Sequence, residues 1–302
     1  MNNQPANQLV SIGLATFNRA SLLKRAVDSL LAQTYPHFEL IISDNASTDE
    51  TEQICREYAQ KDGRIRYFRQ EKSIGAVAQP DFLISKIKGD YFMFASDDDW
   101  WHPDFILRLK ETLDQHSEYG LAMSSLRQVR LDGSLINEIR YDGANDLSSF
   151  SSGRIFTAVL KKNPPVHFFI MGLFRTEVFK KLLWKPNERV LGSDKILMYE
   201  AALFTRFYSL PDILWHRTIH PGPDAEHYGH DYRKVVENRW AYFRHVKVAV
   251  SSLFRSPNIS LSRKVFLLPP KILEMVWTYK KHLLRELWPG GFRQLKQLLK
   301  KG

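Results

Sequence analysis

The chain has 302 residues, 44% of them hydrophobic, and a single cysteine, Cys55, which excludes an intramolecular disulfide. This composition excludes a disordered chain and a disulfide-built secreted domain, and it favours a folded protein of a reducing compartment. The net charge of +10 comes from the C-terminal segment, because residues 231–302 contain 16 Lys and Arg against 4 Asp and Glu.

The N-terminal decapeptide, MNNQPANQLV, lacks the basic and then apolar pattern of a signal peptide. No window of the sequence contains the roughly 20 apolar residues that a membrane-spanning helix needs. We therefore expect a cytoplasmic protein whose contact with a membrane, if it has one, is peripheral.

Apolar runs and amphipathic segments alternate along the first 115 residues. The apolar runs predict buried strands, and apolar residues at three- and four-residue steps predict helices. Expected strands cover residues 9–15, 38–44, 64–70 and 91–95, and expected helices cover residues 21–33, 47–60, 78–88 and 105–113. The second helix begins at Ser47–Glu50, where STDE matches a capping box. The alternation predicts an open α/β sheet with right-handed crossovers.

Three consecutive aspartates follow the strand predicted at residues 91–95. A run of aspartates is often a solvated turn or a helix cap, because carboxylates accept hydrogen bonds from unpaired backbone N–H groups. Here Asp97, Asp98 and Asp99 stand between a buried strand and a helix, and Asp44 ends a second strand. Open α/β sheets bind ligands at the carboxyl ends of their strands, so these carboxylates are candidate site residues.

The turn after the first strand, TFNRAS at residues 16–21, has neither the G-x-G-x-x-G of a dinucleotide site nor the glycine-rich pattern of a P-loop. A carboxylate-lined site therefore needs another way to hold an anionic nucleotide. A divalent cation provides one, because it binds carboxylate oxygens and a diphosphate together. We therefore expect Mn²⁺ or Mg²⁺ as a cofactor.

The segment VSIGLATFNRASLLKRAVDSLLAQTYPHFELIISDNASTDET, followed by GDYFMFASDDDWWHP, closely resembles the nucleotide-binding half of glycosyltransferase family 2, inverting enzymes with the GT-A fold. The resemblance is strong to about residue 115 and weaker to about residue 222. It implies an α/β fold of GT-A type, an open, mostly parallel Rossmann-like sheet flanked by helices. The implied catalytic domain covers residues 8–225, with a nucleotide-binding half at 8–115 and an acceptor half at 116–225, and a basic helical segment follows at 226–302.

Nucleotide contacts are the first roles that the resemblance implies. In that family the loop after the first strand packs against the nucleotide base, which carries this role to Thr16, Phe17, Asn18 and Arg19. The aspartate that ends the second strand, here Asp44, contacts the base as well. The later aspartate cluster corresponds to a DxD-type motif, which touches the ribose and binds the metal.

The register of this DxD-type motif is open in the present sequence. Many members read Leu-Asp-x-Asp-Asp, whereas Ala95 and Ser96 take the first two places here. We assign Asp99 to the metal and Asp98 or Asp97 to the ribose.

Sugar transfer with inversion needs a general base that takes the proton of the acceptor hydroxyl. In the family this base is an aspartate well after the metal motif, a place that Asp194 takes in VLGSDKILMYEAALF, and the alternative is that Asp194 only caps the helix it opens. The segment ILWHRTIHPG resembles the part of the family that closes over the diphosphate. It implies Arg217 as a phosphate ligand and His220 as a metal ligand.

The acceptor side is expected around HFFIMGLFRTEVF, with Met171 and Gly172 near the site. Trp101 is a further acceptor candidate, because aromatic faces stack on sugar rings, and the alternative is that it is a core residue.

The resemblance implies an inverting transfer of a sugar from a nucleotide-diphospho-sugar donor, with a UDP-sugar expected, to a hydroxyl of a glycan or lipid-linked acceptor, as in cell-surface polysaccharide synthesis. Two alternatives remain: a nucleotidyltransferase, and a non-catalytic scaffold that docks at membranes. The basic amphipathic helices of the C-terminal segment suit an anionic membrane surface or a simple packed appendage. No recognition motif supports a nucleic-acid partner.

Overall fold

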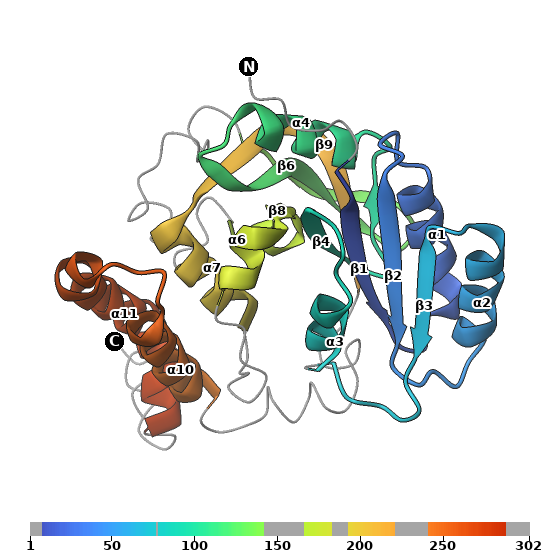
Figure 1. Ribbon diagram of the computed structural model, residues 1–302. Helices are drawn as coiled ribbons and strands as arrows, with labels where there is room; N and C mark the ends of the chain where they lie inside the picture. The colour runs from blue at the N-terminus through green and yellow to red at the C-terminus, as the bar shows by residue number, and fades with distance from the viewer. Residues whose placement is uncertain (1–7, 77, 142–165, 183–192, 221–240, 288–302) are drawn as a thin grey trace.

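The computed structural model describes residues 8–76, 78–141, 166–182, 193–220 and 241–287 (Figure 1). In this part of the chain the strands form one nine-stranded sheet in the order β3-β2-β1-β4-β8-β6-β9-β5, and β7 pairs with β6. The strands are β1 (Val10–Thr16), β2 (Phe38–Asp44), β3 (Ile65–Arg69), β4 (Tyr91–Ala95), β5 (Trp100–Trp101), β6 (Tyr119–Arg130), β7 (Leu135–Ile139), β8 (Leu173–Arg175) and β9 (Arg206–Ile219). The helices are α1 (Ala20–Leu31), α2 (Thr51–Lys61), α3 (Gln79–Ser85), α4 (Phe105–Gln115), η1 (Val166–Met171), α6 (Thr176–Lys181), α7 (Ser193–Phe204), α10 (Ala241–Arg255), η3 (Arg263–Leu267) and α11 (Leu268–Leu287).

The first half of the chain forms the alternating strands and helices predicted from its periodicity. β1 pairs in parallel with β2 and β4, and β2 pairs in parallel with β3. The side chains of β1 and β2 are almost all buried, so both faces of this part of the sheet are covered. α1 and α2 lie on one side of the sheet and α3 on the other (Figure 1). The register sets Thr16 opposite Asp44 and Leu14 opposite Ala95, which brings the carboxyl ends of three strands to one edge.

The predicted capping box is wrong. The helix begins at Thr51, and its N-cap residue, Glu50, makes no side-chain hydrogen bond to the helix. The Ser47 hydroxyl instead accepts a hydrogen bond from the Asn18 backbone N–H at 2.9 Å. Asp49 Oδ1 accepts one from the Thr51 N–H at 3.0 Å. The STDE segment therefore joins the turn after β2 to the turn after β1.

Long strands of the second half extend the sheet beyond β4. β6 pairs in parallel with β9 along most of both strands, and β8 lies between β4 and β6 and runs antiparallel to each. The far end of β9 pairs with the short strand β5, so that His216 faces Trp100 and Trp215 faces Trp101. Residues more than 100 positions after the aspartate cluster thus return beside it.

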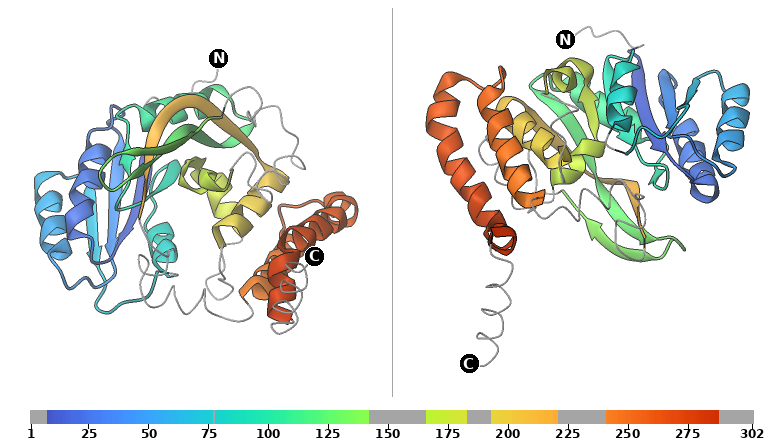
Figure 2. Two further views of the ribbon diagram at one scale, coloured as in Figure 1. Left: turned by 180° about the vertical axis from the view of Figure 1, so that it is seen from behind. Right: turned by 90° about the horizontal axis from the view of Figure 1, so that it is seen from below.

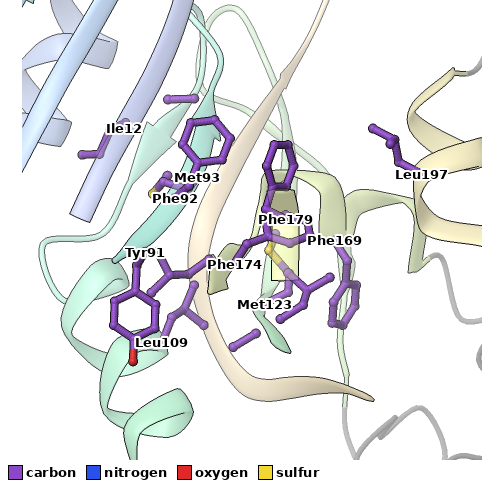
Figure 3. Close-up of a cluster of buried hydrophobic side chains, with 14 of the residues drawn as sticks. Ile12, Tyr91, Phe92, Met93, Leu109, Met123, Phe169, Phe174, Phe179 and Leu197 are labelled. Atoms are coloured by element: carbon purple, nitrogen blue, oxygen red, sulfur yellow. The ribbon is translucent and has the colours of Figure 1, made fainter. Parts of the chain in front are cut away.

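One buried apolar cluster joins the two halves of the sheet. In Figure 3 its side chains come from β1, β4, β6, β8 and the helices around them. The Phe179 ring packs against Phe92 and Phe174, with centroids 4.9 and 5.0 Å apart. Cys55 on α2 is also buried in this cluster, as expected of a packing residue, and burial raises the pKa of its thiol to about 12.

The C-terminal helices α10 and α11 pack on the rest of the protein through α7 (Figure 2). The Ser256 hydroxyl donates to Glu200 Oε1 at 2.5 Å, and the hydroxyl oxygens of Tyr199 and Tyr279 lie 3.3 Å apart. The helix expected in KILEMVWTYKKHLLREL is confirmed as part of α11, whereas the segment GFRQLKQLLKK and the domain boundary expected at residues 225 and 226 lie outside the described residues. None of the helices in the described ranges is long and apolar enough to span a bilayer.

Gly89, just before β4, has no room for a side chain. A Cβ there would lie 2.5 Å from the Leu9 carbonyl oxygen and 2.7 Å from the Ser11 nitrogen, and backbone atoms cannot move aside as a flexible side chain can. We expect Gly89→Ala to lower the free energy of unfolding by about 1–3 kcal/mol in urea titrations. Gly63→Ala is the matched control, because nothing lies within 4 Å of the place that a Cβ at Gly63 would take. Equal urea midpoints for the two variants would contradict this packing.

Candidate active site

Asp44 is fully buried at the end of β2, and both of its carboxylate oxygens accept hydrogen bonds. The Ser47 backbone N–H donates to Oδ1 and the Tyr67 hydroxyl to Oδ2, each at 2.8 Å. Burial, followed by this hydrogen bond, raises the pKa of Tyr67. The phenol therefore stays a proton donor and fixes the orientation of the carboxylate.

The turn between β1 and α1 is held toward the aspartate cluster. Asn18 adopts a left-handed backbone conformation (φ 53°), and its side-chain oxygen accepts the Thr48 N–H at 2.8 Å. Arg19 Nε lies 3.7 Å from Asp97 Oδ1. Phe17 is 42% exposed, so its side chain is accessible to a ligand. The residues expected to contact the nucleotide thus share one edge with Asp97.

The hydroxyl of Thr16 is buried and finds no hydrogen-bond partner among the described residues. Buried polar atoms are nearly always satisfied by protein, water or ligand. Thr16 ends β1 directly opposite Asp44, which places this hydroxyl at the same carboxyl edge.

Asp98 is the aspartate that contacts His220, the residue expected to bind the metal. Its Oδ2 lies 2.8 Å from His220 Nε2, and its Oδ1 accepts the Ser96 hydroxyl at 2.5 Å. The Asp98 carbonyl oxygen accepts hydrogen bonds from Arg25 and from the Thr218 hydroxyl, each at 2.6 Å. Ser96, a departure from the family motif, therefore orients the carboxylate of Asp98.

Asp99 points to β9 and is fully engaged there. The Trp215 indole N–H donates to Oδ2 at 3.0 Å, and the Thr218 backbone N–H donates to Oδ1 at 2.8 Å. Burial, followed by the charge of Asp98, raises the pKa of Asp99 well above its ordinary value. The structure therefore gives no support to the assignment of Asp99 to a metal, and it gives this carboxylate a role in joining two strands.

Sequence reasoning missed three residues of this arrangement: Arg25, Trp215 and Thr218. The Arg25 guanidinium also donates to the Thr218 hydroxyl at 2.8 Å, which ties α1 to β9. No sequence signal marks them, because Arg25 lies within an amphipathic helix pattern and the other two lie in a strand that only tertiary pairing brings to the aspartates.

The remaining expected residues lie on β9, α7 and η1. The Arg217 guanidinium carbon lies 5.2 Å from the centroid of the Phe168 ring. Asp194 is half-buried in the first turn of α7, and Met171 is half-buried at the end of η1. Their roles in catalysis, phosphate binding and acceptor binding stay predictions.

Two acceptor candidates are buried structural residues. Trp101 has no exposed surface, so its ring cannot stack on a sugar in this arrangement, and the core alternative is the one that the structure shows. Gly172 is buried, and a side chain there would collide with the Ala122 carbonyl oxygen. Its backbone contact with β6 explains the glycine without an acceptor.

A divalent cation fits the donor atoms at this edge only in part. Within the described residues no group of three or more His, Cys, Asp or Glu side chains forms a complete metal site. Asp98 and His220 supply one carboxylate and one imidazole, ligands that Mn²⁺ accepts. Mg²⁺ and Mn²⁺ sites of nucleotide enzymes commonly use one or two protein ligands together with phosphate oxygens and water.

The part of the sequence that forms this sheet edge, with its buried aspartates, also matches a known family. Residues 11–183 match the family described as Glycosyl transferase family 2, so the chain belongs to that family. It is 33% identical over 116 residues to a putative teichuronic acid biosynthesis glycosyltransferase, TuaG, of Bacillus subtilis, a match that covers 38% of this chain and 45% of TuaG. It is 28% identical over 107 residues to glycosyltransferase GlyA of Streptococcus pneumoniae, which covers 35% of this chain and 15% of GlyA.

Solved structures share the fold. The structure of residues 1–349 of Staphylococcus aureus TarS with UDP superposes with a TM-score of 0.65 at 15% identity, covering 89% of this chain and 71% of that one. The mannosyltransferase PcManGT of Pyrobaculum calidifontis, in complex with GDP-Man and Mn²⁺, gives a TM-score of 0.53 at 15% identity, covering 97% and 79%. The expected fold of GT-A type, with a curled α/β sheet flanked by helices, is confirmed.

The buried contacts of Asp99 predict that this residue holds the structure together. Removing the carboxylate by Asp99→Ala leaves the Trp215 and Thr218 donors unpaired, and we expect the free energy of unfolding to fall by about 2–5 kcal/mol. Urea titration without nucleotide or metal ion measures this change. Asp212→Ala is the matched control, because Asp212 is a 39% exposed carboxylate on the same strand. If Asp99→Ala is as stable as the wild type, the hydrogen bonds between Asp99 and β9 do not contribute to the stability of the fold.

Proposed function

We propose that this protein is a metal-dependent, inverting glycosyltransferase that acts in the cytoplasm in the synthesis of cell-surface polysaccharide. The donor is a nucleotide-diphospho-sugar, and the acceptor is a hydroxyl of a glycan or a lipid-linked glycan. The contact between Asp98 and His220 carries the proposal, because it joins two residues 122 positions apart at the edge where such sheets bind ligands.

The nucleoside of the donor lies along the turn after β1. The exposed Phe17 ring packs on the base, the buried Thr16 hydroxyl and the Asp44 carboxylate approach it, and Asp97 takes the ribose beside Arg19. A UDP-sugar is the proposed donor, since the TarS structures contain UDP or UDP-GlcNAc. The GDP-Man complex of PcManGT makes a GDP-sugar the alternative to test.

Asp98 and His220 are the proposed ligands of Mn²⁺ or Mg²⁺, in place of Asp99. When bound there, the cation supplies positive charge to the diphosphate. Arg217, on the same strand as Thr218, adds a second positive group whose planar fork suits phosphate oxygens. The diphosphate is thereby held at the ends of β4 and β9.

Asp194 is the proposed general base. Its carboxylate takes the proton of the acceptor hydroxyl, whose oxygen forms a bond to the anomeric carbon of the sugar. The bond from that carbon to the diphosphate breaks on the opposite side, and the leaving nucleoside diphosphate keeps the electron pair. Attack opposite the leaving group inverts the configuration of the anomeric carbon.

Loss of the Asp98 carboxylate tests the donor site. We expect Asp98→Ala to abolish the thermal stabilisation that Mn²⁺ and a UDP-sugar together give the wild type, since ligands stabilise the state that binds them. Transfer should fall by about 100-fold or more, because several kcal/mol of charge stabilisation are lost. Asp212→Ala should keep both properties. Unchanged Mn²⁺-dependent donor binding in Asp98→Ala would exclude the proposed ligand.

Asp194→Asn tests the chemical step apart from binding. We expect kcat to fall by about 10²–10⁴-fold, with the donor-dependent thermal shift intact, because the amide cannot take a proton. Glu177→Gln, which changes another acidic residue in the first turn of a helix, is the control. A variant that keeps most of its transfer rate would remove Asp194 from the mechanism.

The wild type itself distinguishes the alternatives. Donor binding without turnover on any acceptor, including slow hydrolysis, would favour a non-catalytic scaffold. Release of pyrophosphate from a nucleoside triphosphate would favour a nucleotidyltransferase.

A further inference from the structure

Large apolar side chains lie in contact with solvent on the outer face of η3 and α11. Phe266, Leu273 and Trp277 are 80%, 70% and 69% exposed. On the opposite face Met275 and Tyr279 are buried against the rest of the protein. Because an α-helix turns by about 100° per residue, Leu273 and Trp277 point away from that buried face.

These residues belong to a longer row, here named the outer apolar row. Its members are Leu261, Val265, Phe266, Leu273, Val276 and Trp277. Single exposed apolar side chains are common on soluble proteins, but six of them within residues 261–277 favour a surface that contacts something else. Apart from Leu261, its members lie on η3 and α11, which stand at one end of the molecule, away from β1, β2 and β3 (Figures 1 and 2).

The segment that carries this row is rich in positive charge. Residues 241–287 contain nine Lys and Arg against two Glu. Four of the cationic residues lie between positions 263 and 280 of η3 and α11, alongside the row in the sequence: Arg263, Lys264, Lys271 and Lys280. Among the ion pairs formed within the described ranges, only Lys271 of these four has an acidic partner, Glu274 at 3.1 Å.

The C-terminal helices are joined to α7 by two polar contacts. The bond from Ser256 to Glu200 and the contact between Tyr279 and Tyr199 both end on α7. The same helix carries Asp194 in its first turn. The outer apolar row therefore has a set position relative to the candidate active site.

We propose that the outer apolar row docks this protein on the surface of an anionic lipid bilayer. Its apolar side chains enter the boundary between headgroups and acyl chains, and the flanking cations face anionic headgroups, so that the two attractions add. Trp277, with the Lys280 ammonium 3.1 Å from its ring centroid, combines an aromatic body and a long cationic chain, both typical of the membrane interface. A second copy of the chain is a poorer occupant, because it would bring like charges together.

This docking surface goes beyond the proposed transfer reaction and does not depend on it. In the cell it would bring the candidate active site to a lipid-linked acceptor. Binding to lipid can be measured without donor or acceptor, so the two proposals can fail separately.

Co-sedimentation of the full chain with vesicles tests the docking surface. We expect the wild type to bind vesicles of equal parts phosphatidylcholine and phosphatidylglycerol, to bind phosphatidylcholine alone more weakly, and to lose binding as salt rises. The triple variant Phe266→Gln, Leu273→Gln and Trp277→Gln should bind the anionic vesicles about tenfold or more weakly. All three side chains are outward, so circular dichroism and Tm should match the wild type.

The β6 and β7 hairpin offers a matched control. Leu131, Leu135 and Ile136 are 43%, 54% and 41% exposed, and replacing all three by Gln removes as many apolar side chains from another surface. This variant should bind vesicles like the wild type. The pair Lys264→Gln and Lys280→Gln should weaken binding to anionic vesicles by roughly fivefold per lysine and leave binding to phosphatidylcholine unchanged.

Equal vesicle binding by the wild type and the Phe266, Leu273 and Trp277 variant would overturn the proposal. So would a wild type that binds neither kind of vesicle. If sedimentation equilibrium then shows a dimer that this variant converts to a monomer, the row is a contact between copies of the chain. Loss of donor binding with vesicle binding intact would count against the transfer reaction alone.

Discussion

The buried carboxylate of Asp99 is the contact on which the candidate site depends. It accepts the Trp215 indole N–H and the Thr218 backbone N–H, and so joins the turn after β4 to the end of β9. Two residues beyond Thr218, His220 meets Asp98. Without the Asp99 carboxylate, the Trp215 and Thr218 N–H groups would lose their partners in the interior. The end of β9, and with it His220, would lose its position. Of the three aspartates, Asp99 therefore serves the structure, while Asp98 and Asp97 face the other residues of the site.

Strand pairing and core packing bring the parts of the site together on a larger scale as well. Parallel strands place their carboxyl ends at one edge, and the long pairing of β6 with β9 returns the chain to that edge. Aromatic packing of Phe179 against Phe92 and Phe174 holds the second half of the sheet against the first. α7 then links this core to α10 and α11. The candidate base on α7 and the outer apolar row on the C-terminal helices are therefore parts of one packed structure.

Local patterns predicted the first half of the fold well because each element there follows from its own residues. The strand ending at Asp44 and the strand at residues 91–95 match to the residue, since short, fully apolar runs have few other ways to be buried. The capping box failed because tertiary contact offered Ser47 a different donor, the Asn18 backbone. Trp101 was equally ambiguous, since a sequence cannot distinguish a tryptophan in the core from one lining a pocket.

The sequence by itself determined the class of fold, the family, and the placement of aspartates at the ends of two parallel strands, because apolar periodicity and strand order are local properties. Only the tertiary structure decided which aspartate faces which partner. Adjacent side chains in a turn point in different directions, and the donors that select Asp99 lie on β9, more than 100 residues away. The outer apolar row was hidden for the same reason: helical periodicity shows that α11 has apolar residues, but only packing against α10 and α7 shows which of them remain outside.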